Sequence, residues 1–178
     1  MIVLVGESAS GKSSIEKYFV DNYGYNKIVS YTTRPPRDGE VDGVDYHFIG
    51  TEQFETLSEQ GFFAECAQYN SWHYGVAKED CTDDKVAVLT PHGLRQVSKI
   101  KDINVISFYI NVPRRDRLIK ILQRGDSIEE SYRRNLSDVG MFDGIWDEVD
   151  YTINNIGYNK SVADMSKEVL HLVLTHNN

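Results

Sequence analysis

The chain has 178 residues, of which 40% are hydrophobic, which suits one domain that buries its own core. A net charge of −8 argues against broad binding to nucleic acid or to anionic membranes, so any basic site must be local. The two cysteines have no metal-binding pattern around them, and no run approaches the roughly 20 apolar residues that span a bilayer. Because the first residues lack a basic secretion segment, we expect a cytoplasmic protein with free thiols.

The first predicted element is a buried parallel strand at residues 1–5, MIVLV. It leads into GESASGKS at residues 6–13, which has the pattern of a P-loop, and then into a helix with Ile15 and Phe19 on one face. In a P-loop the backbone amides bind donor phosphates, the lysine (Lys12) reaches the β and γ oxygens, and the serine hydroxyl (Ser13) binds Mg²⁺. The predicted ATP-binding residues are Gly6, Glu7, Ser8, Ala9, Ser10, Gly11, Lys12, Ser13 and Ser14.

Residues 30–48, SYTTRPPRDGEVDGVDYHF, predict a second anion-binding segment. Arg34 and Arg37 each offer a planar fork of donors suited to phosphate, and the two prolines between them stiffen the loop. Turn residues follow, and a strand-like rhythm then ends at Tyr46 and Phe48. A solvated surface loop is the alternative for two arginines alone, but the whole combination favours a binding segment.

The rest of the chain alternates helices and strands. Thr51 can cap a helix that runs to Gln60, Thr90 with Pro91 can begin another, and Ser161 can cap a closing amphipathic helix. The predicted strands are residues 62–67, 73–76, 85–89, 103–110 and 149–153. This order predicts an α/β fold with a parallel sheet that is covered by helices on both faces. The strands at residues 62–67 and 73–76 are predicted to form a small insert.

Seven of the 19 basic residues fall between positions 114 and 134. They are Arg114, Arg115, Arg117, Lys120, Arg124, Arg133 and Arg134. Helical spacing predicts an apolar stripe of Leu118, Ile121 and Leu122, which would dock the first helix. Arg117, Lys120 and Arg124 fall on another face, so we expect this helix to present charge as well.

A second helix is predicted directly after this one. Gly125 can end the first helix, and Ser127 with Glu130 can form a capping box for the next. Two such helices make a lid, although a solvated helix pair whose charges only keep the protein soluble is the alternative.

In this order, the motifs resemble those of the guanylate kinase family over almost the whole chain. The specific part is TRPPRDGE followed by DGVDYHF, and FAECAQYNSWHYG comes next. The resemblance implies one domain, 1–178, with a P-loop NTPase-like core (1–30, 85–113 and 146–178), a GMP-binding insert (31–84) and a lid (114–145). It implies that Arg34, Arg37, Tyr46 and Tyr74 hold the GMP phosphate. It further implies that Ser30 and Glu65 contact guanine, whose adjacent N1–H and N2–H donors one carboxylate can accept.

The reaction implied by the resemblance is transfer of the γ-phosphoryl group of MgATP to GMP or dGMP, a step of purine nucleotide metabolism. Positioning and charge would supply the catalysis, with Lys12 and Arg124 on the transferring group and Arg114 or Arg134 closing the lid. The expected partners are ATP, Mg²⁺ and GMP or dGMP, with no nucleic acid polymer and no membrane. The oligomeric state is left open.

Four departures from the family pattern affect the acceptor side and the lid. Val88 and Thr90 stand where two aspartates are usual, so a metal partner and a guanine contact are missing, and Val76 replaces a usual hydroxyl. Thr90 is then expected as the remaining acceptor near the guanine amine, besides Glu65. Lys120 and Asn135 replace usual arginines of the lid.

Two alternatives to GMP phosphorylation follow from these departures. One is a related P-loop kinase for another nucleotide or a phosphorylated ribose. The other is a non-catalytic interaction module, against which the intact Lys12 and Ser13 argue, because such a module has no use for a donor-phosphate cradle.

Overall fold

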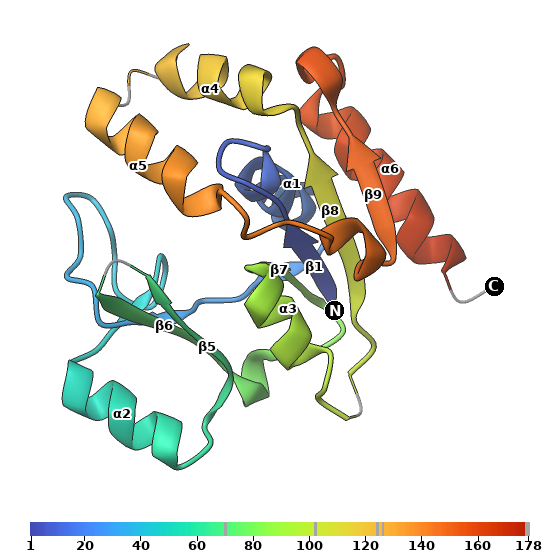
Figure 1. The fold of residues 1–178 in the computed structure, drawn as a ribbon. Helices are drawn as coiled ribbons and strands as arrows, with labels where there is room; N and C mark the ends of the chain where they lie inside the picture. Colours follow the sequence, from blue (N-terminus) through green and yellow to red (C-terminus); the bar gives the residue numbers. More distant parts are fainter. Residues whose placement is uncertain (70, 102, 124, 126, 177–178) are drawn as a thin grey trace.

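The computed structural model describes residues 1–69, 71–101, 103–123, 125 and 127–176. Its central sheet has five strands in the order β2-β7-β1-β8-β9, all parallel (Figure 1). The strands are β1 (Ile2–Val5), β2 (Asn26–Lys27), β7 (Lys85–Val88), β8 (Ile106–Asn111) and β9 (Tyr151–Asn154). The predicted parallel sheet is therefore confirmed.

Helices cover both faces of this sheet, as predicted. Alternation along β1 sends Ile2 and Leu4 to one face, where they pack with residues of α1 (Lys12–Tyr23) and α6 (Val162–Thr175). Val3 and Val5 face the other way, toward the short helix α3 (Pro91–Val97). Two of the predicted caps are also observed, since Ser161 forms a capping box with Asp164 and the Thr90 hydroxyl caps α3. The predicted cap at Thr51 is wrong, because Gly50 occupies the cap position and Thr51 is the first helical residue.

A second sheet is built from residues 31–77. Its order is β4-β3-β6-β5, with β3 (Tyr31–Thr32), β4 (His47–Phe48), β5 (Phe63–Tyr69) and β6 (Trp72–Ala77). Helix α2 (Thr51–Glu59) packs on this sheet through Phe54, whose ring stacks on Phe63 at 4.5 Å between centroids. A 3₁₀ turn, η1 (Lys78–Asp80), then leads the chain back to β7.

Two helices, α4 (Arg114–Gln123) and α5 (Ile128–Asp138), run side by side above the second sheet in Figure 1. The predicted faces of α4 are partly wrong: Arg117 is 5% exposed and Leu122 is 58% exposed. The physical reason is that carboxylates of Glu7 and Asp138 draw the Arg117 guanidinium inward. Arg124 and the side chain of Glu130 lie outside the described residues.

The last segments are η2 (Ile145–Asp147), β9 and η3 (Ile156–Tyr158), followed by α6. None of the helices in the described ranges is both long and apolar enough to cross a membrane. These ranges also hold no group of three or more His, Cys, Asp or Glu residues placed to bind a metal ion without other ligands.

Candidate active site

The predicted P-loop, residues 6–14, turns sharply between β1 and α1. Gly6 has a φ of 152°, and a Cβ at this position would lie 2.8 Å from the Ile110 carbonyl oxygen and 2.9 Å from Ser10 Oγ. Only glycine fits here. Gly11 is the N-cap residue of α1 and has a left-handed conformation. Because it has no side chain, it forms no capping hydrogen bond with the first amides of the helix. The amides of Lys12 and Ser13 in the first helical turn are therefore available to an anion.

Lys12 lies along this loop. Its Nζ donates hydrogen bonds to the Glu7 carbonyl oxygen at 2.8 Å and to Ser10 Oγ at 3.2 Å. Burial lowers the pKa of Lys12 to about 8, against the opposing effect of the Asp138 and Glu7 carboxylates. A phosphate beside Nζ would raise this pKa again, because an anion favours the ammonium form. Ser13, in the first turn of α1, is exposed.

A buried charge network ties α4 and α5, the helices of the predicted lid, to the P-loop. Arg117 of α4 places Nη2 3.4 Å from Glu7 Oε1 and Nη1 3.4 Å from Asp138 Oδ2. Asp138, the last residue of α5, also accepts a hydrogen bond from the Ser8 amide at 2.9 Å. The Tyr109 hydroxyl of β8 donates to the second oxygen of Glu7 at 3.0 Å. The network therefore joins α4, α5 and β8 through the loop.

The predicted lid arginines take different positions. Arg114 begins α4 and donates from Nη2 to Asn135 Oδ1 at 2.5 Å, which connects α4 to α5. Asn135, where the family pattern has arginine, is thus buried as the acceptor for another arginine. Arg134 is half-buried on α5. The predicted role of Arg124 falls on a residue that the structure does not describe.

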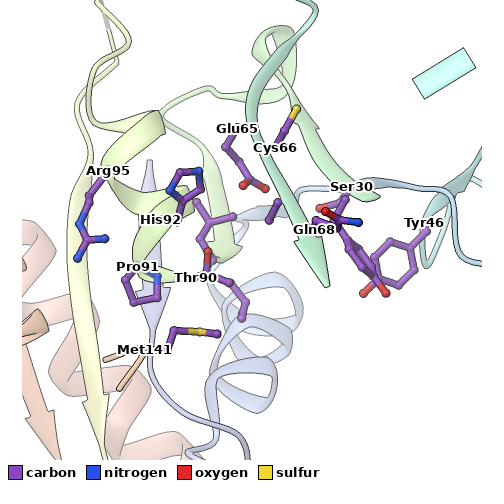
Figure 2. Close-up of a pocket in the computed structure, with 14 residues that line it drawn as sticks. Ser30, Tyr46, Glu65, Cys66, Gln68, Thr90, Pro91, His92, Arg95 and Met141 are labelled. Carbon is purple, nitrogen blue, oxygen red and sulfur yellow. The ribbon is translucent and has the colours of Figure 1, made fainter. Parts of the chain in front are cut away.

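A cavity of about 600 Å³ lies between β5 and the start of α3 (Figure 2). Five of the seven predicted GMP-binding residues line it: Ser30, Tyr46, Glu65, Tyr74 and Thr90. Val88, which the sequence analysis singled out as a departure from the family pattern, also lines it. The sequence did not indicate the other lining residues, which are Cys66, Ala67, Gln68, Leu89, Pro91, His92, Arg95 and Met141. The structure thus brings together residues from the second sheet, from the end of β7 and from α3.

The two predicted phosphate-binding arginines lie at the Tyr46 edge of this cavity and do not line it. Arg34 is 8% exposed, and its Nη2 donates to Glu40 Oε1 at 2.8 Å. Its guanidinium carbon lies 5.4 Å from the centroid of the Tyr46 ring. Arg37 is exposed, and its backbone amide donates to Glu40 Oε2 at 2.7 Å. Burial raises the pKa of Tyr46, and the charges of Arg34 and Arg37 oppose that shift.

Glu65 of β5 is the only carboxylate among the described residues that line the cavity, and it is 6% exposed. Burial raises its pKa to about 7. Helix α3 packs close to it because residue 93 is glycine, where a Cβ would lie 3.0 Å from Glu65 Oε2. Gln96 of α3 also accepts a hydrogen bond from the Cys66 amide at 2.8 Å, which fixes β5 against the helix. The carboxylate is therefore held in place as an acceptor.

The substituted positions make the rest of the cavity less polar. Val76 of β6 is buried, and Val88 at the end of β7 lines the cavity. The Thr90 hydroxyl accepts a hydrogen bond from the Gly93 amide at 3.1 Å, so one of its two lone pairs is used by the helix cap. Thr90 can still donate one hydrogen bond and accept another.

A smaller cavity of about 270 Å³ joins the two predicted phosphate regions. It shares Ser30, Tyr46, Val88 and Leu89 with the larger cavity and extends to Ser13 of the P-loop. Its lining includes Glu16, which the sequence analysis did not single out. The sequence did contain a signal for Glu16, because it lies one helical turn after Ser13 and therefore on the same side of the predicted helix. The P-loop and the larger cavity are therefore contiguous.

The guanylate kinase family model matches residues 1–171. The chain belongs to the guanylate kinase family. The guanylate kinase of Alkalilimnicola ehrlichii is 32% identical, with 93% of this chain and 85% of that protein covered. The guanylate kinase of Clostridioides difficile is 30% identical, with 100% and 88% covered.

Solved structures share the fold of this guanylate kinase family member. The crystal structure of the guanylate kinase from Anaplasma phagocytophilum matches with a TM-score of 0.69 at 21% identity, covering 99% of this chain and 85% of that one. The YorR protein of Bacillus subtilis, crystallised in complex with phosphorylated GDP, matches with a TM-score of 0.53 at 14% identity, covering 100% and 99%.

We predict that Glu65→Gln stabilises the free protein at high pH. The pKa of Glu65 is raised to about 7 in the fold, so its charge costs stability progressively as pH rises from about 4.5 through 7. The variant should gain roughly 2–3 kcal/mol in the free energy of unfolding at pH 8 and little at pH 5, measured by chemical denaturation. If the variant and the wild type differed equally in the free energy of unfolding at pH 5 and pH 8, the charge of Glu65 would not be the cause of the difference.

We also predict that Arg117→Ala destabilises the protein by about 3 kcal/mol, because it leaves the Glu7 and Asp138 carboxylates without their shared cation. The matched control is Arg115→Ala on the exposed side of the same helix, which should change the free energy of unfolding by less than about 0.5 kcal/mol. Denaturant titration of both variants measures the difference. Equal losses in the two would rule out a structural network at Arg117.

Proposed function

We propose that the chain transfers the γ-phosphoryl group of ATP to GMP or dGMP, giving ADP and GDP or dGDP, as a step of purine nucleotide metabolism. The observation that carries this proposal is the buried Glu65 carboxylate in a cavity contiguous with the P-loop. Guanine offers adjacent N1–H and N2–H donors, and one carboxylate accepts both. The guanylate kinase relatives support the same acceptor.

The acceptor residues divide between base and phosphate in this proposal. Glu65, Ser30 and Thr90 would contact guanine. Arg34, Arg37, Tyr46 and Tyr74 would hold the phosphate, and the Arg34 guanidinium carbon 5.4 Å from the centroid of the Tyr46 ring supports that division. Residues 31–84 would then act as the GMP-binding insert, residues 114–145 as the lid, and residues 1–30, 85–113 and 146–178 as the core.

On the donor side, residues 6–14 would hold the triphosphate. The loop amides and Lys12 would position the γ-phosphoryl group and stabilise its charge. The Ser13 hydroxyl suits Mg²⁺, a cation that prefers oxygen ligands and usually binds through few protein groups together with the phosphates. When bound, Mg²⁺ would neutralise phosphate charge. Arg124 would stabilise the charge that develops between donor and acceptor. Arg114 or Arg134 would close the lid over the nucleotides and exclude water, which otherwise competes as the acceptor.

One specific observation supports a second candidate, a related kinase with a different acceptor. Val76 and Val88 both line the smaller cavity and stand where the family pattern has polar side chains, so fewer groups select the base. A non-catalytic module is disfavoured by the complete P-loop. A cytoplasmic location would suit either kinase and the free Cys66 and Cys81 thiols, because that compartment keeps thiols reduced.

A coupled assay of ADP formation from MgATP tests the function against a panel of nucleoside monophosphates and phosphosugars. We expect turnover with GMP and dGMP above all other acceptors. Lys12→Ala is the control, which should lose turnover while isothermal titration still shows GMP binding. Turnover with another acceptor, and none with GMP or dGMP, would refute the proposal.

A further inference from the structure

The metal environment of this P-loop lacks the usual strand-end carboxylate. P-loop enzymes hold Mg²⁺ with the loop Ser or Thr and with an Asp at the end of a neighbouring strand. Here the two strands beside β1 end in Val88 and Asn111, and neither residue is acidic. The cation would then have a single protein oxygen, from Ser13, near the phosphates.

Helix α1 brings a carboxylate to the cavity beside Ser13. The smaller cavity, lined by Ser13 and by Val88, is also lined by two acidic residues, Glu16 and Asp45. Asp45 is already engaged, because its Oδ2 accepts a hydrogen bond from the Val41 amide at 2.8 Å within its own loop. Glu16 is half-buried on α1, one turn after Ser13, and the Val88 backbone amide favours its charged form.

We propose that Glu16 supplies the acidic group of the Mg²⁺ environment, from the helix that follows the P-loop and not from the end of β7. This rests on the proposed use of MgATP as the phosphoryl donor. Mg²⁺ typically binds through one or two carboxylates plus substrate phosphates, so a single Glu is sufficient beside the Ser13 hydroxyl.

The charge balance around Glu16 agrees with this role. In the described part of the chain, no Lys or Arg nitrogen forms an ion pair with its carboxylate within 4.0 Å, and Lys27 acts on it only from a greater distance. Burial raises its pKa to about 7. A divalent cation beside Ser13 would compensate this charge. The shared lining also puts Glu16 between the P-loop and the Ser30 and Tyr46 side of the acceptor cavity.

The test uses Mn²⁺, whose unbound fraction is measured by electron paramagnetic resonance, with the intact chain saturated with ADP. Glu16→Gln removes the charge and keeps the shape of the side chain. We expect it to weaken Mn²⁺ binding to the ADP complex roughly tenfold. The matched control is Asp45→Asn, which removes an acidic charge from the same cavity and should leave Mn²⁺ affinity within about twofold.

Isothermal titration of GMP onto Glu16→Gln checks the fold, and its affinity should match that of the wild type. Unchanged Mn²⁺ affinity in Glu16→Gln, or an equal loss in Asp45→Asn, would overturn the proposal. The measurement needs no acceptor turnover. A wild-type chain that fails to phosphorylate GMP would therefore refute the proposed function separately from the role of Glu16.

Discussion

The parallel pairing of β1 and β7 is the constraint on which the site depends. Leu4 is in register with Val88, so both strands end at the same edge of the sheet. Beyond β1 the chain turns into the P-loop, and beyond β7 it turns into α3, whose Gly93 packs against Glu65. The P-loop and the cavity that holds Glu65 are therefore side by side before any ligand binds.

The second consequence is a concentration of buried charge at this edge. Burial lowers the pKa of Lys12 and raises the pKa values of Glu16 and Glu65, so it favours the neutral form of each side chain. Such groups weaken the fold by themselves, and each suits a ligand of opposite charge or a paired set of donors. Arg117 stabilises the fold instead, because it is buried between two carboxylates and strengthens the attachment of α4 and α5 to the P-loop.

Local patterns in the sequence predicted most of the architecture. The P-loop, the strands around it and the caps at Thr90 and Ser161 depend on neighbouring residues, so they could be read directly. Glu65 was predicted through the resemblance, and its burial by α3 required the structure.

Several wrong or missing assignments involve long-range partners. Helical spacing could not show that Arg117 faces Glu7, which is 110 positions away along the chain. Met141 lines the cavity from beyond α5, and Glu148 positions Arg95 at its edge through a bidentate ion pair. Departures such as Val88 were visible in the sequence, but only the cavity that it shares with Glu16 indicated a replacement.

The central claim is that one continuous site holds both nucleotides. Isothermal titration with a bisubstrate analogue, adenosine and guanosine joined through five phosphates, tests it most directly. The account predicts one analogue per chain, bound at least about tenfold more tightly than either ADP or GMP, and displaced by both together. Binding no tighter than that of one nucleotide alone, or displacement by only one of them, would contradict a continuous site.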